Sequence, residues 1–367
     1  MKLGRTISEL AAEVARQAGL KRDFVAPAAR IGLLPPTQDR PHLALHLSNG
    51  NGGHSFEVGE TAHDQIANRL GIPVRYYERM QTEAPALLAE NVNTWLEKHD
   101  GAYLVRTLDG KARALLSERY RPLDHADLVE AIMPAISQRG LEVMSCEITE
   151  KRLYLKAIDP CIYKDVPTGR KMGDGSHVFF DTMCAALVIS NSEIGWGALS
   201  IESGFYTKAC TNLALIAERG MRKYHVGGKF GSNDEGFYEL LTDQTRRLTD
   251  AAVFMQARDL VASALDQTKF NAMCDDVARM SQDRIEKDPV QVVELAQKKF
   301  QLSDTERGSV LKHLIEGGDL TRYGLFNAVT RSAEEARDYD RATQIERMGG
   351  EIIELGRNDW EALAAKF

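Results

Sequence analysis

Hydrophobic and polar positions along the first 60 residues predict one helix and one β-hairpin. Residues 6–19 carry apolar positions at helical spacing, and Thr6 with Glu9 fits a capping box at the start of that helix. Prolines punctuate residues 20–41, which we expect to form a loop. Residues 42–48 alternate as a strand, and the NGNGG turn that follows predicts a hairpin with a partner strand at about 55–58.

The next segment changes from helical to strand periodicity. Three successive helices are expected at about residues 61–70, 73–80 and 84–99. Two strands follow at residues 102–108 and 112–117, and the Asp-Gly pair between them is typical of a tight hairpin turn. Asp124 is then expected to cap a helix that runs to about Arg139 and ends at Gly140.

Strand patterns dominate residues 141–210. A hairpin is predicted from residues 141–149 and 152–158, and a proline- and glycine-containing loop from 159–175. Two long strands are expected at 177–190 and 195–210, followed by a helix that starts near Thr211.

The remainder of the chain has helical periodicity. One helix is predicted to run from about Gly236 to Lys287, and shorter helices are expected after Pro289, Ser303, Leu320 and Asn358. The predicted fold class is therefore α+β, with an antiparallel β-sheet core, packed helices and an all-helical C-terminal region. The expected division is an N-terminal helix and hairpin at 1–59, an α+β core domain at 60–234 and the helical region at 235–367.

Charge and composition narrow the function classes. The net charge of −7 argues against a protein that coats duplex DNA through bulk positive charge. Residues 241–367 carry 18 Lys+Arg against 23 Asp+Glu, so any nucleic-acid contact is expected outside that third. No apolar run approaches the length that a membrane-spanning helix needs, and we expect a cytoplasmic protein that does not enter membranes.

Known cofactor and catalytic patterns are missing from the sequence. The five cysteines are widely spaced and indicate reduced thiols rather than disulfides or a zinc site. His42 and His46 lie about 13 Å apart on a strand, too far to share one ion. His125, His177 and His225 are open to a catalytic role, although ordinary polar roles are favoured. We therefore expect no catalytic residues, no metal and no cofactor.

One segment has an unusual composition. Residues 219–233, RGMRKYHVGGKFGSN, combine cations with aromatic rings and contain no acidic residue. Single-stranded nucleic acid is bound by this combination, because cations follow the phosphates while rings stack on the bases. The candidate contacts here are Arg219, Arg222, Lys223, Tyr224, His225, Lys229 and Phe230. The alternative is a solvated loop whose cations complement the C-terminal dipole of a preceding helix.

Two further places carry candidate nucleic-acid contacts. Lys164, Arg170 and Lys171 lie in the predicted loop at 159–175, and Arg119 and Arg121 follow the second hairpin. Loops that connect strands often carry binding residues.

Several motifs in fixed order resemble a known family. They are Arg119-Tyr120-Arg121-Pro122-Leu123-Asp124, Cys210-Thr211-Asn212-Leu213, His225-Val226-Gly227 and Asn327-Ala328-Val329-Thr330. Together they resemble the phage/plasmid-like protein family known as domain of unknown function 932, over about residues 60–350. One departure is Leu213, where that pattern has Gly. The order of strands before a helix at Thr211 also resembles, more weakly, the core of ring-forming single-strand annealing recombinases.

The resemblance implies a protein of a mobile element. Combined with the basic and aromatic segment, it leads to the expectation of a nucleic-acid-binding protein, for single-stranded DNA, acting in annealing or recombination. A homo-oligomeric ring is a further expectation. The alternative is a non-enzymatic protein-interaction factor, such as an inhibitor of host machinery, whose acidic helical third docks a basic protein partner. An enzyme without a recognisable motif is the least favoured alternative.

Overall fold

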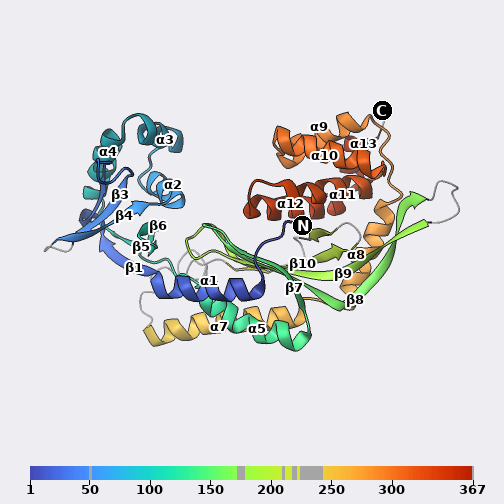
Figure 1. Ribbon diagram of the computed structural model, residues 1–367, viewed down its shortest axis with the longest axis horizontal. Coiled ribbons are helices and arrows are strands. Elements are labelled where there is room, and N and C mark those ends of the chain that lie inside the picture. Colours follow the sequence, from blue (N-terminus) through green and yellow to red (C-terminus); the bar gives the residue numbers. More distant parts are fainter. Residues whose placement is uncertain (49–51, 172–177, 209–210, 217–220, 224–242, 366–367) are drawn as a thin grey trace.

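The computed structural model describes residues 1–48, 52–171, 178–208, 211–216, 221–223 and 243–365. Two β-sheets organise the chain, one in an N-terminal lobe and one in the centre of the molecule (Figure 1). The fold is mixed α+β with antiparallel pairing and a helical C-terminal region, which confirms the predicted fold class.

The N-terminal lobe, residues 22–117, is a curved sheet covered by helices. Its strand order is β1-β5-β6-β4-β3-β2. The strands are β1 Arg22–Pro27, β2 Ile31–Leu34, β3 Ala44–Ser48, β4 Gly53–Val58, β5 Ala102–Leu108 and β6 Lys111–Ser117. The helices are α2 Glu60–Arg69, α3 Val74–Glu83 and α4 Pro85–Glu97, with a short 3-10 turn, η1 Ala28–Arg30. Apolar side chains of one sheet face and of these helices form a single buried cluster.

Both predicted hairpins of this lobe are confirmed. β3 pairs antiparallel with β4, and β5 pairs with β6 across Asp109 and Gly110. Those two turn residues have φ values of 51° and 77°, the left-handed conformation that this tight turn requires. The three predicted helices are also present.

The predicted loop at 20–41 is wrong, because β1, η1 and β2 occupy most of it. Its prolines misled the prediction. β1 and β2 are the two edge strands of the sheet order, and edge strands tolerate a residue that lacks a backbone N–H donor. β4 also pairs in parallel with β6 at Val58 and Ala112, so the sheet crosses the boundary that the sequence suggested at residue 59.

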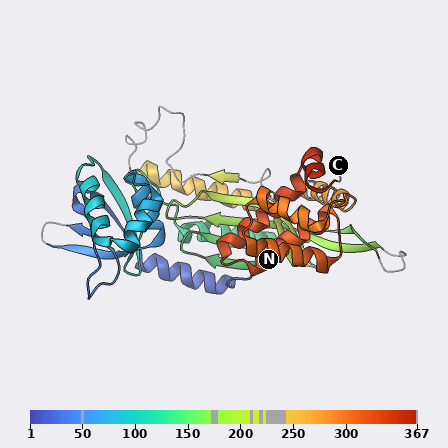
Figure 2. The same cartoon turned by 90° about the horizontal axis from the view of Figure 1, so that it is seen from above.

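The central sheet has the order β11-β10-β9-β8-β7, and β12 also pairs with β10. Its strands are β7 Glu142–Ile148, β8 Leu153–Lys171, β9 Val178–Asn191, β10 Leu199–Thr207, β11 Asn212–Leu215 and β12 Met221–Lys223. One face carries α1 Ile7–Leu20, α5 His125–Arg139 and α7 Asp243–Ser263, and the opposite face carries C-terminal helices (Figures 1 and 2). Every residue of β10 is buried as a result.

Two predictions in this region are wrong. The expected loop at 159–175 is, as far as Lys171, a continuation of β8, whose pairing with β9 shifts register twice. The expected helix at Thr211 is strand β11. Thr211 has a φ of 52°, which reverses the chain so that residues 212–215 pair antiparallel with β10. The next described helix is α7.

The C-terminal region consists of helices, as predicted. They are α8 Gln267–Met280, α9 Pro289–Phe300, α10 Asp304–Gly317, α11 Arg322–Ser332, α12 Tyr339–Glu354 and α13 Arg357–Ala364, with the 3-10 turn η3 Ala333–Glu335. The single helix expected over 236–287 is interrupted, because Asp266 caps α8 by accepting a hydrogen bond from the backbone N–H of Lys269. Among the described helices, none has both the length and the apolar character required to span a bilayer.

Candidate functional site

The basic and aromatic segment 219–233 is described only at Met221–Lys223. These residues form β12, in which Arg222 is opposite Ser200 and Lys223 is opposite Leu199 of β10. The segment therefore includes a strand at the edge of the central sheet. The sequence suggested only a loop that follows a helix. Five other predicted contacts lie outside the described residues: Arg219, Tyr224, His225, Lys229 and Phe230.

The second candidate group lies along β8. The ammonium Nζ of Lys164 is 2.6 Å from a carboxylate oxygen of Asp275 on α8, so this exposed ion pair partly neutralises its charge. Arg170 and Lys171 are the last residues of the strand, rather than parts of a loop.

The third candidate group borders the N-terminal lobe. Arg119 and Arg121 flank Tyr120 in the turn after β6, and both arginines interact within the protein. The hydroxyl of Tyr120 donates to the carbonyl of Ser192 at 3.4 Å. β6 lies in the N-terminal lobe and α8, against which Lys164 packs, lies at the opposite end of the molecule (Figure 1). The structure therefore does not bring these two candidate groups together.

A buried ionic cluster joins the N-terminal lobe to the central sheet. At its centre is Glu193, whose carboxylate lies 3.3 Å from Lys21 Nζ, 3.4 Å from Arg113 and 2.6 Å from the backbone N–H of His125. The side chain of Arg106 donates to the Glu193 carbonyl at 2.7 Å. Burial favours the protonated form of Glu193, but the charges of His125, Lys21 and Arg106 and the hydrogen bond from the His125 backbone N–H lower its pKa to about 2.

Two sequence expectations change at this cluster. Asp124 occupies the N-cap position of α5 as predicted, but its carboxylate makes no capping bond and instead contacts Arg106 at 2.8 Å and Lys21 at 2.7 Å. His125, considered for catalysis, is 3% exposed, and burial lowers its pKa to about 4. The arrangement is that of a structural histidine that stays uncharged near neutral pH.

Two motifs of the family resemblance meet inside the protein. The side-chain amide of Asn212 on β11 donates to the side-chain oxygen of Asn327 on α11 at 3.0 Å. Thr211 donates to Glu334 at 3.0 Å. Neither residue caps a helix, because the helix expected near Thr211 is strand β11. The contact between Asn212 and Asn327 therefore joins a strand to a helix.

A second buried ionic group lies between the central sheet and α12. Lys156 Nζ of β8 is 2.6 Å from Glu346 of α12, and the two side chains are 1% and 0% exposed. The same ammonium lies 4.3 Å from the ring centre of Tyr339. Beside this pair, Arg347 contacts both carboxylate oxygens of Glu202, at 2.8 and 3.0 Å. The only signal of this group in the sequence is a lysine inside an apolar strand, and the prediction of functional residues missed it.

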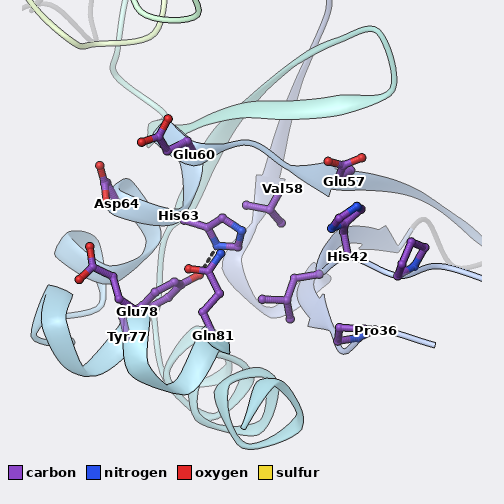
Figure 3. A pocket seen from close by; sticks show the side chains of 12 residues that line it. Pro36, His42, Glu57, Val58, Glu60, His63, Asp64, Tyr77, Glu78 and Gln81 are labelled. Atoms are coloured by element: carbon purple, nitrogen blue, oxygen red, sulfur yellow. Dashed lines mark hydrogen bonds between the residues drawn. The ribbon is translucent and has the colours of Figure 1, made fainter. Parts of the chain in front are cut away.

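The N-terminal lobe contains a cavity of about 460 Å³ between the sheet, α2 and α3 (Figure 3). Its polar lining includes several acidic residues and two histidines. The lining residues are Pro36, Pro41, His42, Leu43, Glu57, Val58, Glu60, His63, Asp64, Tyr77, Glu78 and Gln81. The sequence-based prediction missed this site, although Glu60, His63 and Asp64 recur at the spacing of one helix face.

A histidine–tyrosine pair lies at the centre of the cavity. Nδ1 of His63 is 2.8 Å from the hydroxyl of Tyr77, which is 1% exposed (Figure 3). Burial lowers the pKa of His63 to about 4, and burial also raises the pKa of Tyr77. Both groups are consequently uncharged near neutral pH.

The acidic side chains that line the cavity differ in whether a cation pairs with them. Glu57 pairs with Lys111 at 3.0 Å. Within the described part of the chain, Glu60, Asp64 and Glu78 form no ion pair. Burial raises the pKa of Asp64, and the other two carboxylates raise it further against the opposing effect of Lys151. No group of three or more His, Cys, Asp or Glu side chains among the described residues could hold a metal ion.

The described cysteines are free thiols. Cys146, Cys184 and Cys274 are buried and Cys161 is exposed. The prediction of reduced, mostly buried thiols is confirmed for these four, and Cys210 lies outside the described residues.

Comparisons with known proteins do not place the chain in a family. No family model, no curated protein and no solved structure matches it.

Proposed function

We propose that this protein binds single-stranded nucleic acid, with single-stranded DNA as the substrate, and that it acts without catalysis in annealing or recombination for a mobile element. The observation that carries the proposal is the composition of residues 219–233, which hold four Lys or Arg and two aromatic rings without a carboxylate. Cations that follow phosphates and rings that stack on bases are the common means of binding single strands.

The architecture around this segment supports an edge location for binding. Along β10 the central sheet carries helices on both faces, so a nucleic acid has no open sheet face there on which to stack (Figure 1). β12 is hydrogen-bonded to β10, which anchors Arg222 and Lys223 at the edge of that sheet. By contrast, Lys164 already contacts Asp275. The edge segment is therefore the favoured contact among the three candidate groups.

The proposal is tested by fluorescence anisotropy with a labelled oligothymidine at low salt. Replacing Arg219, Arg222, Lys223 and Lys229 with Ala should remove most of the binding. The slope of log K against log salt should also become shallower, by up to about 0.7 for each phosphate that the variant protein no longer neutralises. The matched control replaces Lys298 and Lys312, exposed lysines on α9 and α10, and should bind as the unchanged protein does.

Base stacking is tested separately by replacing Tyr224 and Phe230 with Leu. Affinity should fall by about 1–3 kcal/mol per stacked base, with the salt dependence unchanged. The proposal fails if the unchanged protein does not retain oligonucleotide at micromolar concentration, or if the control lysines matter as much as the segment.

A further inference from the structure

The far ends of β8 and β9 form a two-stranded ribbon at the end of the molecule opposite the N-terminal lobe (Figures 1 and 2). β7 pairs with β8 only as far as Ile158, and β10 pairs with β9 from Met183 to Ser190. Residues 160–171 of β8 and 178–182 of β9 therefore extend beyond the neighbouring strands of the central sheet.

One face of this ribbon is packed against helices. Residues directly opposite each other in an antiparallel pair point to the same face, which places Lys164 and Val166 together with Asp181. Lys164 contacts Asp275 of α8, and Asp181 accepts a hydrogen bond from the hydroxyl of Tyr323 on α11. Val166 and Asp181 are buried as a result.

The other face of the ribbon is exposed and carries two aromatic rings. Tyr163, Asp165 and Pro167 alternate along β8 on this face, and Phe180 of β9 is opposite Pro167. Tyr163 is 58% exposed and Phe180 is 61% exposed. The carboxylate of Asp165 accepts a hydrogen bond from Thr182 on the same face. The two rings thus face solvent on a strand pair whose core side is already filled.

The rings are spaced as two separate platforms. Tyr163 is opposite Cys184, and Phe180 is four residues from Cys184 along β9, or about 13 Å at the rise of a strand. Aromatic rings stack on each other only when their centres are about 4.5–7 Å apart. Each ring is therefore able to receive its own planar group.

The charges next to the rings favour an anionic partner. Lys208 is exposed and directly follows β10. Burial raises the pKa of the Cys184 thiol against the opposing effect of Lys208, so this cation lies near Cys184 and thus on the side of Tyr163. β8 itself ends with Arg170 and Lys171. Rings that stack on bases beside cations that contact phosphates are the chemistry of single-strand binding.

A second copy of the chain fits this face less well. A stable protein interface buries about 800 Å² on each partner, whereas two half-exposed rings offer on the order of 200–300 Å². β8 also carries Pro160 and Pro167, and prolines on an edge strand are a common protection against pairing with another chain.

We propose that the β8–β9 ribbon is a second contact surface for single-stranded DNA, on which Tyr163 and Phe180 each stack one base while Lys208 contacts a phosphate. This inference rests on the proposed function and adds a site that the segment 219–233 does not include.

The ribbon is far enough from β12 to be tested separately. Arg222 of β12 is opposite Ser200, which lies six residues before Tyr206 on β10. Tyr206 is in register with Cys184, and through it with Tyr163. The separation along the sheet is about 20 Å.

The test is fluorescence anisotropy of the full chain with a labelled oligothymidine at low salt. Tyr163→Leu and Phe180→Leu should each weaken binding about fivefold or more, because each removes one stacked base, and the salt dependence should stay the same. Lys208→Ala should make the salt dependence shallower, by up to about 0.7 in the slope of log K against log salt. The matched controls Tyr76→Leu and Trp95→Leu, at half-exposed rings on α3 and α4, should bind as the unchanged protein does.

Photochemical crosslinking separates direct stacking from an indirect effect. An oligothymidine with one 5-iodouracil should, after irradiation, crosslink to peptides that contain Tyr163 or Phe180, as identified by mass spectrometry. Each Leu variant should lose its own crosslink and keep its melting temperature, since both rings are exposed. A loss of affinity without a crosslink at either ring in the unchanged protein would overturn the proposal.

The outcomes distinguish the ribbon from the segment 219–233. If the unchanged chain binds oligothymidine and both ribbon variants bind like Tyr76→Leu, the ribbon proposal is overturned and the proposed function stands. If the ribbon variants lose affinity while the variant of the four segment cations still binds, the ribbon is supported and the segment is not the contact. Failure of the unchanged chain to bind at micromolar concentration overturns both.

Discussion

The ionic cluster around Glu193 and the cavity around His63 both gather charged groups, but they differ in how those charges are balanced. In the cluster, the Glu193 carboxylate contacts Lys21 and Arg113, and Asp124 contacts Arg106. In the cavity, Glu60, Asp64 and Glu78 form no ion pair among the described residues. Glu60 and Glu78 are exposed, so water stabilises their charges, whereas the buried Glu193 depends on neighbouring cations. An unpaired carboxylate at the surface therefore costs little, and loss of a partner is costly only in the buried cluster.

The largest expected effect comes from Lys156–Glu346, the most deeply buried ion pair among the described residues, in which each charge has a partner. Lys156→Met should reduce the free energy of unfolding by about 3–5 kcal/mol, because Glu346 remains buried without its cation. Chemical denaturation measures this change. Adding Glu346→Leu should recover most of the loss, since an apolar pair of similar volume replaces both charges. If Lys156→Met is as stable as the original protein, the ion pair with Glu346 does not stabilise the fold.

A smaller loss is expected at the cluster that joins the N-terminal lobe to the central sheet. Glu193→Gln should cost about 1.5–3 kcal/mol, because the amide keeps the shape but removes the charge that Lys21 and Arg113 face. Urea unfolding compared with Glu83→Gln, which breaks only an exposed pair with Arg79, measures the difference. Equal effects of the two variants would contradict a structural role for the cluster.

The smallest expected effect, counted per pH unit, is a pH dependence of stability to which both regions contribute. His63 in the cavity and His125 beside the cluster have folded pKa values of about 4, below the ordinary 6.5. Between these pH values the unfolded chain binds more protons, so stability should fall as pH decreases from 6.5 to 4. The slope is at most about 1.4 kcal/mol per pH unit for each histidine.

The variant His63→Gln should remove one of these two contributions. Urea unfolding at several pH values measures the slope, and His125→Asn provides the matching experiment in the other region. Unchanged slopes in both variants would show that other groups control the acid sensitivity.

The fold was predictable wherever local chemistry decides the backbone. The Thr6–Glu9 capping box and the Asp109–Gly110 turn both form as expected, because each depends on contacts within a few residues. Predictions failed where pairing with a distant strand outweighed local preference. Residues 22–34 include Pro27 yet contribute two edge strands, and residues 212–215 pair with β10 instead of starting a helix.

The candidate sites also differ in whether the sequence alone can reveal them. The basic and aromatic composition of residues 219–233 can be recognised from the sequence, because it depends on residue types in one short stretch. The cavity could not be recognised, since Glu57 comes from β4, His63 from α2 and Tyr77 from α3. The partner of Lys156 is likewise 190 residues away in the chain.

By itself, the sequence determined most of the helices, the tight turns, the fold class and the stretch in which cations and rings occur together, because each follows from residues close along the chain. Only the tertiary structure decided which charges are neutralised. Asp124 binds Arg106 instead of capping a helix, and Asp64 lines a cavity without an ion pair among the described residues. The physical reason is that desolvation and ion pairing depend on neighbours in space, which strand pairing and helix packing bring together.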